Sequence, residues 1–391
     1  MKRQRLEYAV ALGGGGTKGA YQVGVIKALK ELRIPVKAVS GTSIGAINAA
    51  FMTQDDIEHL EKLYLNMKFS NVCKDEIEID ETKDLLDIKN LFNVIVEYIK
   101  NNGLDNSALK EMLQKNLNIN KIYSSKRDMG LVTYSMKDKE VVRKFKNEIN
   151  KDDFIDYVLA SACFPIFKKQ KIKNQEYIDG GVADVIPINM LIEKGYKNII
   201  AVDIEGIGIT QNIDTRDAYI KLIYPSEDLG GMFEFDKKRI KRNIEMGYLD
   251  TMRYFGKLQG SYYYFESRDF GNALKTLSGE AIYGLECAGK LYGIDNNKVY
   301  KFDEFLDKVM KKHNTIYKEY KNIDGVIDMK KLFQGKKISD YLDVKYGICL
   351  FIDAIKLRPT IMNMKIVEKN FAELLNGARA ILEVQNEIKY L

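Results

Sequence analysis

The N-terminal part of the chain alternates between two hydrophobic patterns. Residues 6–12 and 36–43 are short apolar runs rich in strand-forming residues, whereas residues 21–32 and 44–53 place apolar side chains at helical spacing. A strand, a helix, a second strand and a second helix in this order predict a parallel α/β sheet.

Further elements follow up to about residue 210, where the pattern changes. It predicts, in order, two strands within 129–145 joined by a turn at Asp138, a helix within 153–164, and strands at 176–181 and 198–204. Beyond this point the pattern is that of longer helices with polar faces. We therefore predict an α/β domain over residues 1–210 and a mainly helical region, of unknown role, over residues 211–391.

The composition is that of a globular protein with a sizeable core. Hydrophobic residues make up 46% of the chain, and 61 basic against 55 acidic residues leave a net charge of +6. A surface of this charge is typical of a lysine-rich protein and also suits contact with anionic membranes. Nucleic acid is not an expected partner, and the oligomeric state stays open.

Targeting and metal signals are weak. The basic N-terminal segment has an apolar run that is short and stops at glycines, so it predicts a buried strand and not a signal peptide. No apolar stretch of about 20 residues predicts a membrane span. The four cysteines form no CxxC pair, which favours a reducing compartment and no metal site. We expect a cytoplasmic location, with peripheral membrane contact left open.

The segment GGGTKG, Gly14 to Gly19, is the first candidate motif. It fits the dinucleotide pattern G-x-G-x-x-G between a strand and a helix, but the second strand ends without the acidic residue that would hold a ribose. It is not a P-loop either, because Lys18 precedes Gly19 where Ser or Thr should bind magnesium. Glycines that only allow close strand–helix packing are the structural alternative.

The segment GTSIG, Gly41 to Gly45, is the second candidate. A strand before it and a helix after it give the context of a nucleophile elbow, in which Ser43 stands on a sharp turn. The alternative is that Ser43 only caps the helix. Both motifs end neighbouring strands, so the amides of Gly14, Gly15 and Gly16 could bind the oxyanion formed when Ser43 attacks an ester. Lys18 would add positive charge there or stay in solvent.

The proton acceptor for Ser43 is the third question. The two histidines, His59 and His313, lie in charged helical segments where solvated positions are expected. A carboxylate could serve if burial raised its pKa, and Asp179, at the end of an apolar strand and before two glycines, is the best candidate. Asp179 as a simple turn residue is the alternative. Asp184 and Asp203 are weaker candidates, since each also suits a strand end or a cap.

Three motifs in this order resemble the patatin-like phospholipases, which are lipid acyl hydrolases with a Ser-Asp dyad. They are GGGTKG (14–19), GTSIG (41–45) and DGG (179–181), with ASACFPIF (160–167) as a softer match. The resemblance covers roughly residues 6–210 and departs from the family pattern at Val185, where Asn often stands. It implies a three-layer α/β/α sandwich with a mostly parallel central sheet.

The resemblance also implies the roles of individual residues. Ser43 would be the nucleophile and Asp179 its base, without a metal or other cofactor. The glycine run, with Lys18 and the amide of Ile44, would form the oxyanion hole. The remaining motif glycines would support these turns: Gly19, Gly41, Gly45, Gly180 and Gly181.

The predicted function is the hydrolysis of fatty-acyl esters in phospholipids or other acyl lipids. Segments 85–100 and 342–356 could line an acyl channel or face the core, and the basic runs 168–173 and 237–242 could touch lipid headgroups or only be solvated. Three alternatives remain: a non-catalytic lipid-binding protein of the same fold, an esterase that uses His313 as base, and a dinucleotide-binding oxidoreductase.

Overall fold

The computed structural model describes residues 6–75, 103–213, 215, 218–322, 343–357 and 365–390. Contacts divide the chain into two compact units, 1–251 and 252–391. The first unit therefore extends beyond the α/β domain predicted for residues 1–210, and that prediction of where the catalytic domain ends stays a prediction. The apolar segment at 85–100 lies outside the described residues.

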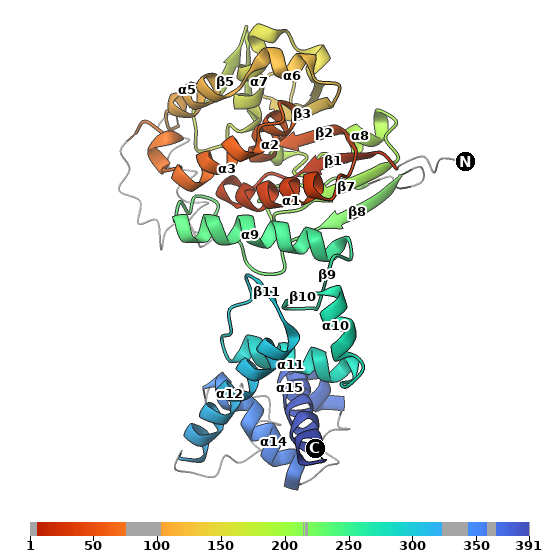
Figure 1. Cartoon of the computed structure of the whole chain (residues 1–391). Helices are drawn as coiled ribbons and strands as arrows, with labels where there is room; N and C mark the ends of the chain where they lie inside the picture. Colours follow the sequence, from red (N-terminus) through yellow and green to blue (C-terminus); the bar gives the residue numbers. More distant parts are fainter. Residues whose placement is uncertain are drawn as a thin grey trace, which may run out of the picture. The chain divides into compact units, whose positions relative to one another are not determined.

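The first unit is built on an eight-stranded sheet (Figure 1). Its strands are β1 (Tyr8–Leu12), β2 (Val36–Thr42), β3 (Asp128–Ser135), β4 (Glu140–Phe145), β5 (Gln170–Ile172), β6 (Gln175–Asp179), β7 (Asn198–Val202) and β8 (Tyr219–Ile223). The order is β5-β6-β3-β2-β1-β7-β8, with β4 paired to β3. Strands β3, β2, β1, β7 and β8 run parallel, whereas the β3–β4, β3–β6 and β5–β6 pairs are antiparallel. The predicted α/β fold with a mostly parallel sheet is thus confirmed.

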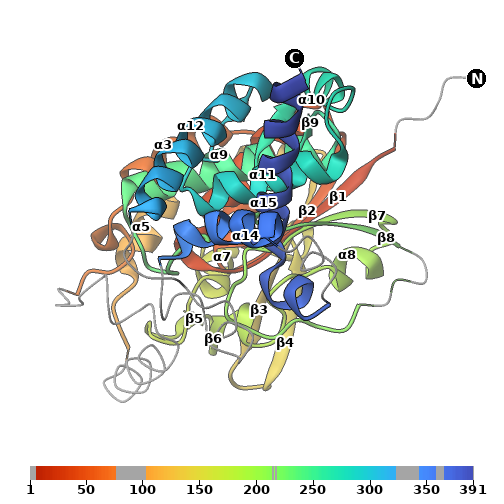
Figure 2. The same cartoon turned by 90° about the horizontal axis from the view of Figure 1, so that it is seen from below.

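Helices cover both faces of this sheet (Figures 1 and 2). They are α1 (Ala20–Glu31), α2 (Ile44–Thr53), α3 (Ile57–Asn66), α5 (Ser107–Asn116), α6 (Ile119–Ser124), α7 (Phe154–Ser161), α8 (Asn189–Glu193) and α9 (Lys237–Tyr254). On the α8 side, Ala9 and Ala11 of β1 pack with Met190 and Leu191 in one buried cluster. Strand residues alternate between the two faces, which gives three layers.

The second unit is mainly helical, as the pattern after residue 210 predicts. It holds α10 (Ser267–Ala273), α11 (Gly279–Leu291), α12 (Phe302–Lys321), α14 (Gly347–Leu357) and α15 (Lys365–Tyr390). The unit also contains a small sheet of three strands, β9 (Leu258–Gln259), β10 (Tyr264–Glu266) and β11 (Val299–Tyr300). The helices pack around one aromatic-rich core that includes Tyr263, Phe265, Phe305 and Phe351.

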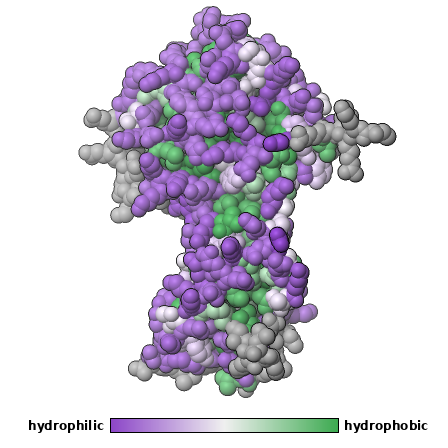
Figure 3. All heavy atoms as spheres, in the orientation of Figure 1, coloured by the Kyte–Doolittle hydropathy of each residue, from purple (hydrophilic) through white to green (hydrophobic). Residues whose placement is uncertain are grey.

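Polar residues predominate on the visible surface of the protein. The face of the protein seen in Figure 3 is mainly hydrophilic in both units. Within the ranges that the structure describes, none of the helices combines the length and hydropathy needed to cross a bilayer.

A substitution at Gly45 tests how closely α2 packs on the sheet. A Cβ added to Gly45 would lie 2.2 Å from the Leu12 carbonyl oxygen, a main-chain atom that can move only with β1. We expect Gly45→Ala to lower the free energy of unfolding by about 2 kcal/mol or more, because overpacked interiors cost typically 1–3 kcal/mol. Urea denaturation measures this change.

Gly271→Ala is the matched control for that substitution. Gly271 lies in α10, and no heavy atom lies within 4 Å of the Cβ position there. Alanine should therefore stabilise this helix by up to about 1 kcal/mol. Equal effects of the two substitutions would contradict the close packing at Gly45.

Candidate active site

Ser43 stands on a sharp turn between β2 and α2. Its backbone has φ 58° and ψ −128°, and a positive φ of this kind is strained for a residue with a side chain. The Ser43 amide donates a hydrogen bond of 3.0 Å to Oγ of Ser161, which itself donates to the Val132 carbonyl at 2.6 Å. Ser161, at the end of α7, therefore ties the strained turn to β3.

Close backbone contacts explain the glycines on either side of Ser43. A Cβ on Gly41 would lie 2.2 Å from the carbonyl group of Gly45, and one on Gly45 would lie 2.2 Å from the Leu12 oxygen. Only glycine lets the first turn of α2 come this close to the ends of β1 and β2. The first backbone N–H groups of α2, including that of Ile44, have no partner within the helix and point from its N-terminus toward the turn that carries Ser43.

The glycine run lies beside this turn, but its amides are not equivalent. The Gly14 amide donates to the Val185 carbonyl at 3.0 Å, and its predicted role as an oxyanion donor stays a prediction. The amides of Gly15 and Gly16 donate to no acceptor within the described chain. A Cβ on Gly16, whose φ is +60°, would lie 2.2 Å from the Met232 oxygen.

Lys18 and Gly19 complete the run. The Lys18 ammonium donates to the Glu205 carbonyl at 3.2 Å, and its predicted place at an oxyanion hole stays a prediction. Gly19 lets the run pack under α3, because a Cβ there would lie 2.4 Å from the Tyr64 hydroxyl.

Asp179 ends β6 and is buried, with 2% of its surface exposed. Its amide donates to the Cys163 carbonyl at 2.8 Å, and its Oδ1 accepts the Gly181 amide at 2.8 Å. Oδ2 has no hydrogen-bond partner within the described residues. A Cβ on Gly180 would lie 2.4 Å from the Val132 oxygen, so the DGG turn also depends on close backbone packing.

Burial raises the pKa of Asp179 from 3.8 to about 7, because the charged form loses its hydration. The Ser43 hydroxyl and the Gly181 amide act in the opposite direction and lower this pKa, as donors to the carboxylate do. Ser43 is thus close enough to influence Asp179, although their side chains do not meet the geometry of a formed hydrogen bond.

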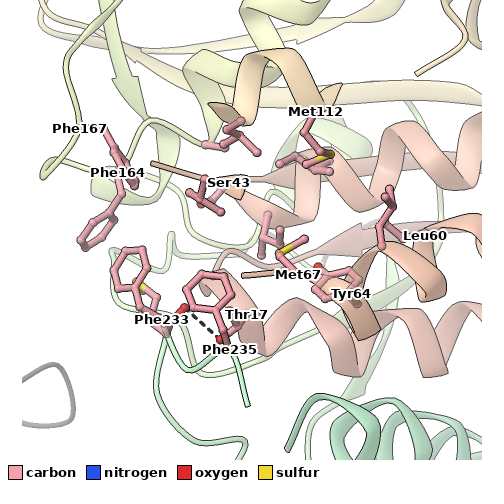
Figure 4. A pocket seen from close by; sticks show the side chains of 18 of the residues that line it. Thr17, Ser43, Leu60, Tyr64, Met67, Met112, Phe164, Phe167, Phe233 and Phe235 are labelled. Carbon is pink, nitrogen blue, oxygen red and sulfur yellow. Dashed lines mark hydrogen bonds between the residues drawn. The ribbon is translucent and has the colours of Figure 1, made fainter. Parts of the chain in front are cut away.

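Two cavities meet at Ser43. The first runs between α2, α3 and α5 and is lined largely by apolar side chains, including Ile47, Phe51, Leu60, Leu63, Met112, Phe167 and Phe233. Figure 4 shows Ser43 between phenylalanines 164, 167 and 233 on one side and Leu60 and Met112 on the other. The second cavity holds both Ser43 and Asp179, together with Gly14 and Gly15.

Neither histidine is among the described residues that line the two cavities. His59 lies in α3, where its Nε2 pairs with Oδ1 of Asn116 at 2.7 Å, and it lines a separate polar groove. The expectation that His313 is solvated is wrong, since it is 1% exposed in the core of the second unit. Its Nδ1 pairs with the Tyr292 hydroxyl at 2.8 Å, and burial lowers the pKa of His313 to about 4.

The other carboxylates have structural partners. Asp184 is buried and pairs with Arg143 at 3.0 Å, although burial raises its pKa. Asp203 accepts the Glu205 amide at 2.8 Å in a turn. No cluster of three or more His, Cys, Asp or Glu side chains is arranged to hold a metal ion within the described ranges.

Two structural contributions to the site escape the sequence patterns. Ser161 falls in the ASACFPIF segment, where small and apolar residues surround it. Nothing in this pattern indicates that its hydroxyl accepts a hydrogen bond from the Ser43 amide. The loop 204–209 lies directly on the site, because a Cβ on Gly206 would meet the Gly14 oxygen at 1.9 Å and one on Gly208 the Gly181 oxygen at 2.2 Å. The glycines of IEGIGI could have signalled this close approach.

The basic runs carry less free charge than their sequences suggest. The lysines of 168–173 pair with Asp105, Glu176 and Asp153. In 237–242, Arg239 pairs with Glu234 and Lys241 with Glu245, and Arg242 pairs with Glu227. Exposed pairs of this kind contribute little to stability, but they neutralise much of the charge that a lipid headgroup would meet.

Comparison with known proteins agrees with the motifs. The family model described as patatin-like phospholipase matches residues 10–192. Over 46 residues the chain is 56% identical to Lysophospholipase nte1 of Aspergillus terreus, covering 12% of this chain and 3% of that protein. Over 107 residues it is 32% identical to Triacylglycerol lipase 4 of Saccharomyces cerevisiae, covering 23% of this chain and 12% of that protein. The matches thus span only a small part of these relatives.

A solved structure extends over most of the chain at low similarity. The crystal structure of VipD from Legionella pneumophila covers 99% of this chain and 86% of its own, with 14% identity and a TM-score of 0.40.

The raised pKa of Asp179 predicts a pH-dependent stability. Between about pH 4 and 7 the unfolded chain ionises this carboxyl group while the folded protein keeps it protonated, so the unfolded state binds fewer protons. The wild-type free energy of unfolding should therefore fall by about 1.4 kcal/mol per pH unit because of this group. Asp179→Asn should remove that slope, so its stability relative to wild type rises from pH 4 to 7 in urea denaturation. A difference that is constant with pH would contradict the prediction.

Proposed function

We propose that this chain, whose residues 10–192 form a patatin-like phospholipase domain, is a lipid acyl hydrolase that uses Ser43 as nucleophile and Asp179 as base. One observation carries the proposal: a serine on a strained strand–helix turn shares a cavity with a buried carboxylate whose pKa is raised to about 7. A base with a pKa near the working pH is effective in proton transfer.

The first step transfers the acyl group to Ser43. The Asp179 carboxylate takes the hydroxyl proton as Ser43 Oγ bonds to the ester carbonyl carbon. Oδ1 is held by the Gly181 amide, and the unpartnered Oδ2 is the oxygen available to accept this proton. The bond to the alcohol oxygen then breaks, and protonated Asp179 returns the proton to that oxygen.

The second step repeats this proton transfer with water. Asp179 takes a proton from the water as the water oxygen attacks the acyl carbon, and Ser43 regains its proton when the free acid leaves. Both steps pass through a tetrahedral oxyanion, for which the amides of Gly15, Gly16 and Ile44 are the proposed donors. The loss of one such donor typically costs about 10²–10³ in rate.

The first cavity is the proposed binding site for the fatty-acyl chain. It begins at Ser43, Gly16 and Ile44 and is walled by buried apolar side chains such as Phe51 (0% exposed) and Leu60 (1%). Burial of each methylene group contributes about 0.8 kcal/mol, so a lining of this kind favours long acyl chains. Phospholipids and other acyl lipids are the proposed substrates, which implies peripheral contact with a lipid surface.

The proposed dyad predicts a specific pattern of variants. Ser43→Ala should abolish hydrolysis of short- and medium-chain chromogenic esters, and Asp179→Asn should lower kcat/KM by at least about a thousandfold, because each removes an essential group. His59→Ala is the control, since His59 pairs with Asn116 outside both cavities. The assay needs no added metal, and circular dichroism checks that each variant folds. Full activity of Ser43→Ala would contradict the proposal.

The pH dependence of catalysis follows from the same carboxyl group. Asp179 must be ionised to accept the serine proton, and its pKa lies at about 7. We expect kcat/KM to rise about tenfold per pH unit below pH 7 and to level off above it. Initial rates between pH 5 and 9, corrected for spontaneous hydrolysis, measure the profile. A rate already at its plateau at pH 5 would exclude Asp179 as the base.

A further inference from the structure

The second cavity provides a second binding space next to Ser43, and we call each of the two spaces an arm of the site. Within the described residues, its lining shares Ser43, Phe164 and Met232 with that of the first cavity. Phe164 and Met232 therefore flank the nucleophile at the point where the two cavities meet. An ester bound with its carbonyl carbon at Ser43 would place one substituent in each cavity.

The chemistry decides which substituent enters which cavity. Asp179 lines the second cavity, and in the proposed mechanism it returns a proton to the leaving alcohol oxygen. The alcohol side of the ester must therefore lie on the Asp179 side of Ser43. The acyl chain then extends the other way, past Gly16 and Ile44 into the first cavity.

Apart from Asp179, the second cavity is mainly apolar. Its wall includes Val182, Val185, Pro165 and Ile207 as well as Phe164 and Met232. Ile207 is 47% exposed, so this wall reaches the protein surface, where Ile209 is 55% exposed. A polar alcohol would gain little from these side chains, whereas hydrocarbon would gain with every methylene group it buries.

The backbone holds this apolar wall in place. The Ile209 amide donates to the Gly181 carbonyl at 3.0 Å, and the Ile209 carbonyl accepts the Val185 amide at 2.8 Å. The loop that carries Ile207 is thus fixed to the DGG turn next to Asp179. Glycines 206 and 208 allow this approach, as their neighbours leave no room for a Cβ.

We propose that the enzyme acts on esters with hydrocarbon on both sides of the scissile bond, the acyl chain lying in the first cavity and a lipophilic leaving alcohol in the second. This rests on the proposed function. Glycerolipids that keep a second acyl chain on the leaving alcohol belong to this class, and lysolipids, whose leaving alcohol is polar, do not. The site therefore selects for the alcohol as well as for the acid.

Isomeric esters test the two arms separately. Ethyl decanoate and octyl butanoate have the same composition, but the long chain lies on the acid in one and on the alcohol in the other. Ethyl butanoate is the short reference, and all three are assayed below their solubility limits by titration of the released acid. We expect kcat/KM for both long esters to exceed that of ethyl butanoate by at least about tenfold, since each fully buried methylene contributes about threefold to fourfold.

Two variants assign the arms to the cavities. Ile207→Asn makes the wall of the second cavity polar and should lower kcat/KM for octyl butanoate at least about fivefold more than for ethyl decanoate. Leu63→Asn, in the wall of the first cavity, should do the reverse. Ile213→Asn is the control: Ile213 is a 36% exposed isoleucine farther along the same loop and lines neither cavity, so the ratio of the two rates should stay unchanged.

The outcomes separate this inference from the proposed function. If ethyl decanoate is favoured but octyl butanoate is hydrolysed no better than ethyl butanoate, the protein is an acyl hydrolase and the two-armed site is wrong. An unchanged ratio in Ile207→Asn overturns the assignment of the second cavity. If wild type hydrolyses none of the esters, or Ser43→Ala hydrolyses them as well as wild type, the proposed function itself fails.

Discussion

The active site depends on one backbone contact, the approach of the first turn of α2 to the end of β1. At Gly45 this approach leaves no space for a side chain in front of the Leu12 carbonyl, and Gly41 makes a similar contact from the end of β2. The contact forces the chain between them into a turn so tight that Ser43 takes a positive φ. A contact from outside the turn stabilises this strained backbone, because the Ser43 amide donates a hydrogen bond to the Ser161 hydroxyl. The serine hydroxyl and the free amides of α2 are thereby fixed next to the same cavity before any substrate arrives.

Burial of Asp179 links stability to the proposed chemistry. The surroundings that exclude water from this carboxyl group also raise its pKa, so the ionised form required of a base is the form that the fold disfavours. The Gly181 amide relieves part of this cost at Oδ1, but Oδ2 keeps an unmet hydrogen-bonding capacity. Oδ1 of Asp184 and Oδ1 of Asn243 are also buried without a hydrogen-bond partner among the described residues, so Asp179 is distinguished by sharing a cavity with Ser43. In the proposed mechanism, Oδ2 of Asp179 is the oxygen that accepts the proton of the Ser43 hydroxyl.

The sequence predicts the local features of this protein better than the contacts between distant segments. The strand–turn–helix around Ser43 and the strand before Asp179 follow from apolar runs and glycines within a few residues, and the structure has both. The sequence could not show that the Gly14 amide is taken by Val185, because the two residues meet only after the sheet is assembled. For the same reason it missed Ser161. His313 looks solvated within its charged helix, yet its position on the same face as Val309 and Ile316 brings it into a core.

The site also needs a segment that lies beyond the predicted α/β domain. Thr17, in the glycine run, donates its hydroxyl to the Gly231 carbonyl at 3.0 Å and its amide to the Met232 carbonyl at 2.8 Å. These bonds place Met232 against Gly16 and Phe233 in the wall of the first cavity. The segments that carry the family motifs therefore hold the proposed reacting groups, whereas a later part of the first unit closes the apolar space around them. In the proposed function, we therefore expect substrate preference to depend on segments that carry no catalytic motif, as is common for loops positioned by a rigid scaffold.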